Sequence, residues 1–279
     1  MIKSNQISAQ AKSVEDMADF TVNGEPVKDL EDKFKETIEA FLVEERLDSL
    51  VYESSEQEKL GNIYKKKGTR QAQNLPTGIS VTLPPLVHIQ PIPQGVDMSI
   101  PTEGWIESSD SVRNHLLREL ASEVAWAETQ LLVKSLLDVG REFHPMEAVF
   151  SGASINEASN WIRTNASSPD TMIVHPFEEE KLIMRSQEFR SVQSLPEHLK
   201  KEGGNHFSGI LRGVNVYWTP AIPEKVILLY EKVQIRQQRT PLSVQFDAYN
   251  RMPEKLSLHE DYVAWSIDEK AVAKILTRE

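Results

Sequence analysis

The sequence predicts an α+β fold, and three features of its hydrophobic pattern support this prediction. Residues 109–139 repeat apolar positions at helical spacing over a length far above that of an average globular helix. Residues 75–104, just before them, hold six of the fifteen prolines and predict extended chain. Beyond residue 150, short alternating segments typical of strands are interspersed with short helical segments.

The composition excludes several kinds of site. A chain of 279 residues is long enough to bury a sizeable core. It contains no cysteine, which excludes disulfides, thiolate metal sites and a cysteine nucleophile. The first 20 residues lack the apolar stretch of a signal peptide, and no run of roughly 18 apolar residues exists to span a membrane. We therefore expect a cytosolic or cytosol-assembled protein with no membrane partner.

The negative charge is concentrated in the first part of the chain. Residues 1–60 contain 15 Asp or Glu against 7 Lys or Arg, a net charge of −8 out of −11 for the whole protein. Such a chain is a poor candidate for binding nucleic acid across its surface. The one concentrated basic run, residues 64–70, contains Lys65, Lys66 and Lys67. Its two interpretations are a solvated loop and a local contact with phosphate or an acidic partner.

The N-terminal part of the chain predicts an arm followed by one helix. Residues 1–28 are polar and mixed, which is typical of a flexible arm. Residues 29–52 place apolar side chains at helical spacing, and Asp29 is available as a cap. The helix is therefore amphipathic and needs a partner for its apolar face, which consists of Leu30, Phe34, Ile38, Phe41 and Leu42.

The proline-rich residues 75–104 predict an extended hairpin that projects from the body. Ile79, Val81 and Leu83 alternate with polar residues, as in a strand. Because proline cannot donate to a strand ladder, these strands cannot be central in a sheet. A loop of this length without a helix of its own usually has a function, often a contact with another molecule.

Residues 109–139 predict one helix of roughly 45 Å, at about 1.5 Å per residue. Val112, Leu116, Leu120 and Val124 repeat every four residues, and Gly140 is expected just past the C-terminus. A helix of this length is typical of one that runs through and supports a broad, flat domain.

The remaining chain predicts alternating helices and strands. Ser154 and Glu157 form a capping-box pattern, which predicts that a helix starts there. Asp268 is expected to cap a final helix, DEKAVAKIL. Strands are expected in SPDTMIVHP, GILRGVNVYW, KVILLYEKV, LSVQFDAYN and LSLHEDYVAWSI.

The segment DTMIVHPFEEEKL, residues 170–182, allows two interpretations. His175, Glu178 and Glu179 could hold a metal or move a proton, or they could mark the step from a strand to a helix. A zinc-hydrolase helix of the H-x-x-E-H kind needs a second histidine where Glu179 stands. Pro176 suits the first turn of a helix, and the glutamates complement the positive end of its dipole. We therefore expect a helix start here and no metal site.

No other pattern predicts catalysis. The glycine- and serine-containing residues 203–209 do not form a nucleophile elbow, and no Walker or dinucleotide-binding glycine pattern follows a strand. Glu260 and Asp261 are adjacent on an expected strand, so they face opposite sides of the sheet. The sequence predicts no catalytic, cofactor-binding or metal-binding residues, and we expect a protein that is not an enzyme.

The order and local sequence of these segments resemble the Hong Kong 97-type capsid fold, which tailed-virus shells share with encapsulin nanocompartments. DTMIVHPFEEEKL is similar to the strand–proline–helix step of tailed-virus major capsid proteins. GILRGVNVYWTPAIPEKVILLYEKV resembles their G-V-x-V-Y strand, proline-containing turn and following strand. LHEDYVAWSIDEKAVAKI is similar to their closing strand and alanine-rich helix. The resemblance covers about residues 75–276.

The resemblance implies a division of the chain into the parts of such a subunit. These parts would be an N-terminal arm with an amphipathic helix (1–60), an extended loop lying on a neighbouring subunit (62–106), a peripheral domain (107–164) with a spine helix at 109–139, an axial domain around the five- and six-fold axes (165–245), and a return to the peripheral domain (246–279).

The resemblance also implies intersubunit contacts made by the extended loop. In some members of the fold a loop lysine forms an isopeptide bond to a neighbour, but residues 71–108 contain no lysine, so we expect no such crosslink. The nearest lysines are Lys65, Lys66 and Lys67. The apolar loop positions without an evident core of their own are Val81, Leu83, Leu86, Val87 and Ile89.

The function that the resemblance implies is structural. We expect self-assembly through pentamers and hexamers into an icosahedral viral capsid in the host cytoplasm, which encloses double-stranded DNA without sequence-specific binding. Portal, scaffold or decoration proteins are further candidate partners, and no cofactor is expected. Two alternatives stay open: an encapsulin-like shell around cargo protein, and a small α+β enzyme with an unrecognised site. The acidic N-terminal helix is unlike the short helix that opens encapsulins, which favours the virus.

Overall fold

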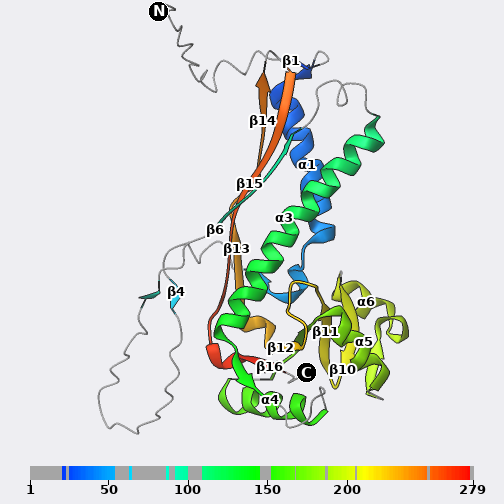
Figure 1. Ribbon diagram of the computed structural model, residues 1–279, viewed down its shortest axis with the longest axis vertical. Helices are drawn as coiled ribbons and strands as arrows, with labels where there is room; N and C mark the ends of the chain where they lie inside the picture. The colour runs from blue at the N-terminus through cyan, green and yellow to red at the C-terminus, as the bar shows by residue number, and fades with distance from the viewer. Residues whose placement is uncertain are drawn as a thin grey trace, which may run out of the picture.

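The computed structural model describes residues 21–22, 25–53, 63–64, 86–87, 92–99, 109–144, 152–166, 168–185, 188–204, 206–249 and 252–276. Within these residues the molecule is elongated, with two regions joined by the long helix α3 (Asp110–Val139) (Figure 1). One region is a narrow ribbon of strands with helix α1 (Val27–Glu45) beside it, and the other is a wider sheet with shorter helices around it (Figure 1).

Helix α3 confirms the long helix expected from the sequence. It follows Ser109 and ends before Gly140, whose N–H donates to the Leu136 carbonyl over 2.9 Å. Gly140 has a φ of −64°, so it does not use the left-handed conformation common after helices. Glycine suits this position for another reason, because a Cβ there would lie 3.0 Å from the Leu136 carbonyl oxygen.

Helix α1 is amphipathic as predicted, and its partner is the same chain's α3 together with the ribbon strands. Phe34, Ile38 and Leu42 are buried in one cluster with residues of α3, and Leu30 and Phe41 pack against it. The helix spans 27–45 rather than 29–52, so the predicted boundaries were wrong. Beyond it, a 3-10 turn η2 (Asp48–Leu50) and strand β3 (Tyr52–Glu53) follow, because Leu47, Leu50 and Val51 enter a second core instead of continuing the α1 stripe.

The ribbon is built around one long strand, β15 (Met252–Ser266). Strands β14 (Ser243–Tyr249) and β6 (Ile92–Ser99) pair antiparallel with β15, β13 (Ile235–Arg239) pairs with its C-terminal end, and β3 runs parallel to β13. Among the described strands, β6 pairs with β15 alone, as expected for a strand that contains proline. Residues 92–99 of the predicted extended loop thus lie on the chain's own sheet.

The second sheet has seven strands, and its two faces contact different helices. On one face, Met172, Val174 and Val216 pack with residues of α4 (Gly152–Asn165). On the other face, Ile173 and Tyr217 pack with the C-terminal end of α3. Successive residues alternate between the two faces, as the strand period requires. The strand order is β7 (Arg141–Phe143), β16 (Val272–Leu276), β12 (Val226–Tyr230), β8 (Thr171–Val174), β11 (Val214–Trp218), β10 (Phe207–Leu211) and β9 (Phe189–Ser191).

Shorter elements complete the described fold. A two-stranded ladder joins β1 (Thr21–Val22) to β2 (Glu25–Pro26), and another joins β4 (Ile63–Tyr64) to β5 (Leu86–Val87). Helices α5 (Pro176–Arg185) and α6 (Glu197–Gly203) flank the seven-stranded sheet, and the remaining 3-10 turns are η3 (Val192–Ser194), η4 (Lys232–Gln234) and η5 (Glu269–Ala271). In the part of the chain that is described, no helix has the length and hydrophobicity needed to cross a membrane.

Three further sequence-based expectations about elements were wrong. The predicted final helix is a single 3-10 turn capped by Asp268, followed by strand β16. A strand forms there because residues 272–276 pair with both β12 and β7, and this pairing buries Val272 and Ile275. GILRGVNVYW is a hairpin rather than one strand, with Arg212 and Gly213 at positive φ in its turn. Helix α4 begins at Gly152, so the capping-box pattern from Ser154 lies inside the helix.

Candidate functional site

The His175 segment is the start of a helix, as predicted. Strand β8 ends at Val174 and α5 begins at Pro176. The His175 carbonyl accepts hydrogen bonds from the N–H groups of Glu178 and Glu179 at 2.9 and 3.0 Å, and its Nδ1 accepts from Phe177 N at 3.3 Å. His175 therefore caps the helix N-terminus.

The loop residues expected to contact a neighbour lie mostly outside the described residues. This applies to Lys65, Lys66, Lys67, Val81, Leu83 and Ile89. Leu86 and Val87 form β5, which pairs antiparallel with Ile63 and Tyr64 of β4. The structure thus brings residues 63–64 and 86–87 together as two arms of one ladder.

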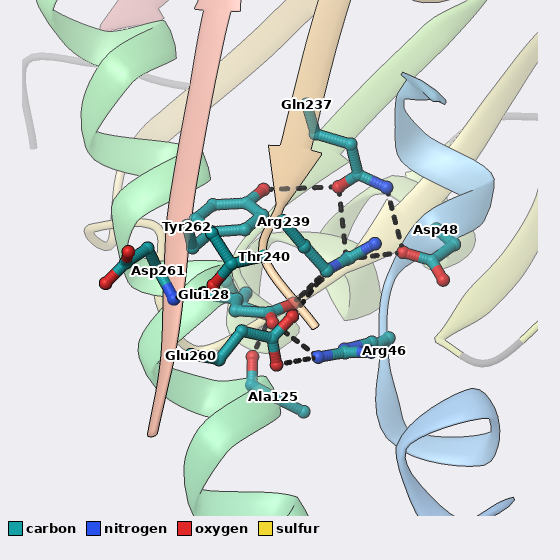
Figure 2. A network of polar contacts seen from close by, with 11 residues as sticks. Arg46, Asp48, Ala125, Glu128, Gln237, Arg239, Thr240, Glu260, Asp261 and Tyr262 are labelled. Atoms are coloured by element: carbon teal, nitrogen blue, oxygen red, sulfur yellow. Dashed lines mark hydrogen bonds and ion pairs between the residues drawn. The ribbon is translucent and has the colours of Figure 1, made fainter. Parts of the chain in front are cut away.

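A cluster of buried charged groups, which the sequence analysis missed, lies where α1, α3 and the ribbon meet (Figure 2). Five elements or connections supply it, and we call it the junction cluster. Its members are Arg46 after α1, Asp48 in η2, Glu128 in α3, Gln237 and Arg239 in β13, and Glu260 and Tyr262 in β15.

Strand and helix periodicity place these side chains together. Gln237 and Arg239 are two residues apart on β13, and Glu260 and Tyr262 are two residues apart on β15, so each pair shares one face of its strand. Glu128 follows Val124 by one helical turn and belongs to the buried stripe of α3. Asp261 points away from the cluster, which confirms that it and Glu260 face opposite sides (Figure 2).

Two guanidinium groups bridge three carboxylates. Arg46 Nη2 donates to Glu128 Oε1 over 2.8 Å and to Glu260 Oε2 over 2.5 Å. Arg239 Nε donates to Glu128 Oε2 over 3.0 Å, and its Nη2 donates to Asp48 Oδ1 over 2.6 Å. Arg–carboxylate contacts of this length are among the strong hydrogen bonds of proteins.

Neutral groups complete the cluster on the side of β13. Gln237 Nε2 donates to Asp48 Oδ1 over 3.0 Å, and the Tyr262 hydroxyl donates to Gln237 Oε1 over 3.3 Å. The Arg239 guanidinium lies 5.4 Å from the centre of the Tyr262 ring. Burial raises the pKa of the Tyr262 hydroxyl above its ordinary value, so it is a neutral donor.

Burial and neighbouring charges act differently on Glu260, Asp48 and Arg239. Burial raises the pKa of Glu260 to about 7, with Arg46 opposing the shift and Glu128 adding to it. Burial also acts to raise the pKa of Asp48, but the charge of Arg239 and the hydrogen bonds from Gln237 and Arg239 outweigh it, so that pKa lies below its ordinary value. Burial disfavours the charge on Arg239, yet Glu128 and Asp48 hold its pKa above the ordinary range.

The arrangement is suited to fastening segments together. It ties residues 46–48 to α3 and β13, and the Tyr230 hydroxyl, 3.0 Å from the Leu50 carbonyl oxygen, adds a bond from the seven-stranded sheet. Among the residues that the structure describes, no group of three or more His, Asp or Glu could hold a metal ion. The junction cluster therefore holds the chain in place between α1 and β3.

Comparison with known proteins gives no match in sequence and many in structure. No protein-family model matches the chain, and no curated protein sequence matches it. The virus-like particle from Pyrococcus furiosus is similar, with a TM-score of 0.59 and 12% identity over 88% of this chain and 99% of that chain. The capsid of an empty GTA particle has a TM-score of 0.58 and 10% identity over 84% and 90% of the two chains.

An encapsulin is also similar in structure. The holo-SrpI encapsulin complex from Synechococcus elongatus has a TM-score of 0.52 and 16% identity, over 71% of this chain and 76% of that chain. At such low identities the likeness is one of fold.

Proposed function

We propose that this chain, which has the Hong Kong 97-type capsid fold, is a structural shell subunit that assembles with copies of itself. The fold confirms both the α+β class and the resemblance found in the sequence. The observation that supports the function best is that the likeness extends over 99% of a chain that builds a virus-like particle. The elongated body, in which one helix joins a narrow ribbon to a wider sheet, offers long surfaces for neighbouring subunits (Figure 1).

Within this class, we propose an icosahedral viral capsid that assembles through pentamers and hexamers in the host cytoplasm and encloses double-stranded DNA. A net charge of −11 supports enclosure of DNA without tight binding, because phosphate binding needs clustered cations. Helix α1 covers its apolar stripe against the same chain's α3, so this stripe is not left for cargo. Portal, scaffold or decoration proteins are further candidate partners. The likeness to an encapsulin supports the second candidate, a shell around cargo protein.

We also propose that residues 62–106 form an extended loop that contacts a neighbouring subunit, except where β6 joins the chain's own sheet. The contact would use Val81, Leu83, Leu86, Val87 and Ile89. The basic run Lys65–Lys67 would face acidic side chains of the neighbour. The outer face of α1 offers such groups, since Asp32, Glu36 and Glu39 are exposed.

Electron microscopy and light scattering of the purified full-length chain test this function. We expect closed shells, or five- and six-subunit capsomers, when the protein is expressed alone or with its partners. A compact monomer at high concentration would contradict the shell function. If shells form, their contents after nuclease treatment separate the two candidates: protected DNA supports the viral capsid, and a folded protein cargo supports the encapsulin.

A further inference from the structure

The junction cluster contains one more acidic group than it has arginines to neutralise it. Glu128, Glu260 and Asp48 face the guanidinium groups of Arg46 and Arg239, and the side chains of Glu128 and Glu260 are only 4% and 3% exposed. Both glutamates contact the same nitrogen, Arg46 Nη2. Two ionised carboxylates on one donor repel each other, and a proton on one of them removes this repulsion.

Among the residues that the structure describes, the charged and titratable groups around this pair come from several elements. Arg46 and Asp48 belong to the segment after α1, Arg239 to β13, and Tyr262 to β15 itself. Lys232 in η4 acts on Asp48 at longer range and also on Asp170. These groups therefore neutralise the Asp48 side of the cluster more fully than the side of the two glutamates.

The contacts identify which carboxylate would hold the proton. Glu128 uses both oxygens as acceptors, Oε1 from Arg46 and Oε2 from Arg239. Asp48 accepts from both Arg239 and Gln237. Glu260 has one close partner, Arg46, whereas its Oε1 lies 3.9 Å from Arg239 Nε. Glu260 therefore gives up the fewest contacts with cations when it is protonated, and burial also favours its protonated form by raising its pKa.

We propose that the junction cluster binds one proton on Glu260 near neutral pH, and that this proton makes the attachment of residues 46–53 to α3 and β13 sensitive to pH. When the proton leaves, a second buried negative charge appears beside Glu128. The cluster then holds residues 46–53 less tightly against α3 and β13. This inference concerns the subunit itself and does not depend on the proposed shell function.

The direction of the pH effect follows from proton linkage. The folded chain binds the Glu260 proton more tightly than the unfolded chain does, since the pKa is raised on folding to about 7. The resulting stabilisation is fully present below the ordinary carboxyl pKa of about 4.3 and is lost as pH rises through about 7. The attachment is therefore tightest in mild acid.

Thermal unfolding of the full-length chain at several pH values tests this proposal. For the native chain we expect the melting temperature to fall by about 2–3 °C between about pH 6 and pH 8 because of this group. Glu260→Gln, which mimics the protonated side chain, should abolish most of that fall. Asp261→Asn is the matched control: the residue is adjacent but points out of the cluster, so this variant should follow the native curve. Parallel curves for the native chain and Glu260→Gln would overturn the proposal.

Two measurements on the native chain keep the proposal testable if Glu260→Gln does not fold. Infrared difference spectra of protein with isotope-labelled glutamate should show a protonated carboxyl band that disappears between about pH 6 and pH 8. Hydrogen exchange of the amides of residues 46–53, corrected for the intrinsic pH effect, should speed up over the same range. Absence of the band at the lower pH would overturn the assignment of the proton, and unchanged exchange would overturn the attachment.

Discussion

Arg239 on β13 and Glu128 on α3 are 111 positions apart in the chain, yet Arg239 Nε donates to Glu128 Oε2 over 3.0 Å inside the molecule. The same guanidinium also contacts Asp48 beyond α1. One side chain therefore connects the long helix, the ribbon and the N-terminal segment. Glu128 and Asp48 depend on it for neutralisation, which leads to the first prediction.

Replacing Arg239 with methionine should destabilise the chain by about 3–5 kcal/mol, because Asp48 loses its main cation and Glu128 must share Arg46 with Glu260. The matched control is Arg118→Met, which removes a surface pair with Glu44 whose side chains are 50% and 59% exposed. That change should cost no more than about 1 kcal/mol. Urea denaturation followed by circular dichroism gives both values. Equal losses for the two variants would show that Arg239 is not the central cation of the cluster.

The sequence was sufficient to predict elements whose own periodicity matches their burial. Helices α1 and α3 were found because their apolar stripes face partners on one side, and β8 and β12 because both are continuous apolar runs. Strand β13 was missed because its inward positions, Gln237 and Arg239, are polar members of the junction cluster. A pattern of alternating apolar residues could not reveal such a strand.

The junction cluster itself could not be predicted, because its contacts join residues far apart in the sequence. Arg46 lies 82 positions from Glu128 and 214 from Glu260. Local spacing, which identified the start of α5, therefore carries no information about these pairs. The final strand β16 was missed for a related reason: its alanine, lysine and leucine suit a helix, and only pairing with β12 and β7 makes it a strand.

Replacing His175 with alanine should remove a helix cap and leave the rest of the molecule intact. The Nδ1 bond from Phe177 N is lost, at an expected cost of roughly 0.5–2 kcal/mol, while the carbonyl bonds to α5 persist. His198→Ala, at an exposed position of α6, is the control and should change stability by less than about 0.5 kcal/mol. Thermal melts and metal analysis check both. A bound metal lost only in His175→Ala would contradict the capping role.

Two glycines of the β10–β11 hairpin should differ in how well they tolerate substitution by a residue with a side chain. Gly209 has a φ of +151°, and a Cβ there would lie 2.1 Å from the Arg190 carbonyl oxygen of β9. Gly209→Ala should therefore push β9 away and cost at least about 1–3 kcal/mol. Gly213, at φ +84°, has nothing within 4 Å of such a Cβ, so Gly213→Asn should cost less than Gly209→Ala, since only backbone strain opposes it and asparagine tolerates positive φ better than most residues. Thermal melts give the costs, and hydrogen exchange at residues 189–191 reports the strand. Equal protection in both variants would refute the close contact.

The last prediction concerns the extended loop as a contact with a neighbouring subunit. Val81 and Leu83 alternate with Ser80 and Thr82, so on an extended chain the two pairs face opposite sides. If the apolar side docks on a neighbour, the double variant Val81→Asp, Leu83→Asp should bury two charges in the interface and stop assembly. The subunit should still fold, with the helical circular dichroism signal of α1 and α3 unchanged. The control variant Ser80→Asp, Thr82→Asp adds the same charge on the other side and should assemble normally. Size-exclusion chromatography and electron microscopy compare the two. Shells of normal size from the first variant would show that these residues do not make the contact, and unfolding of its subunit would place them in the chain's own core.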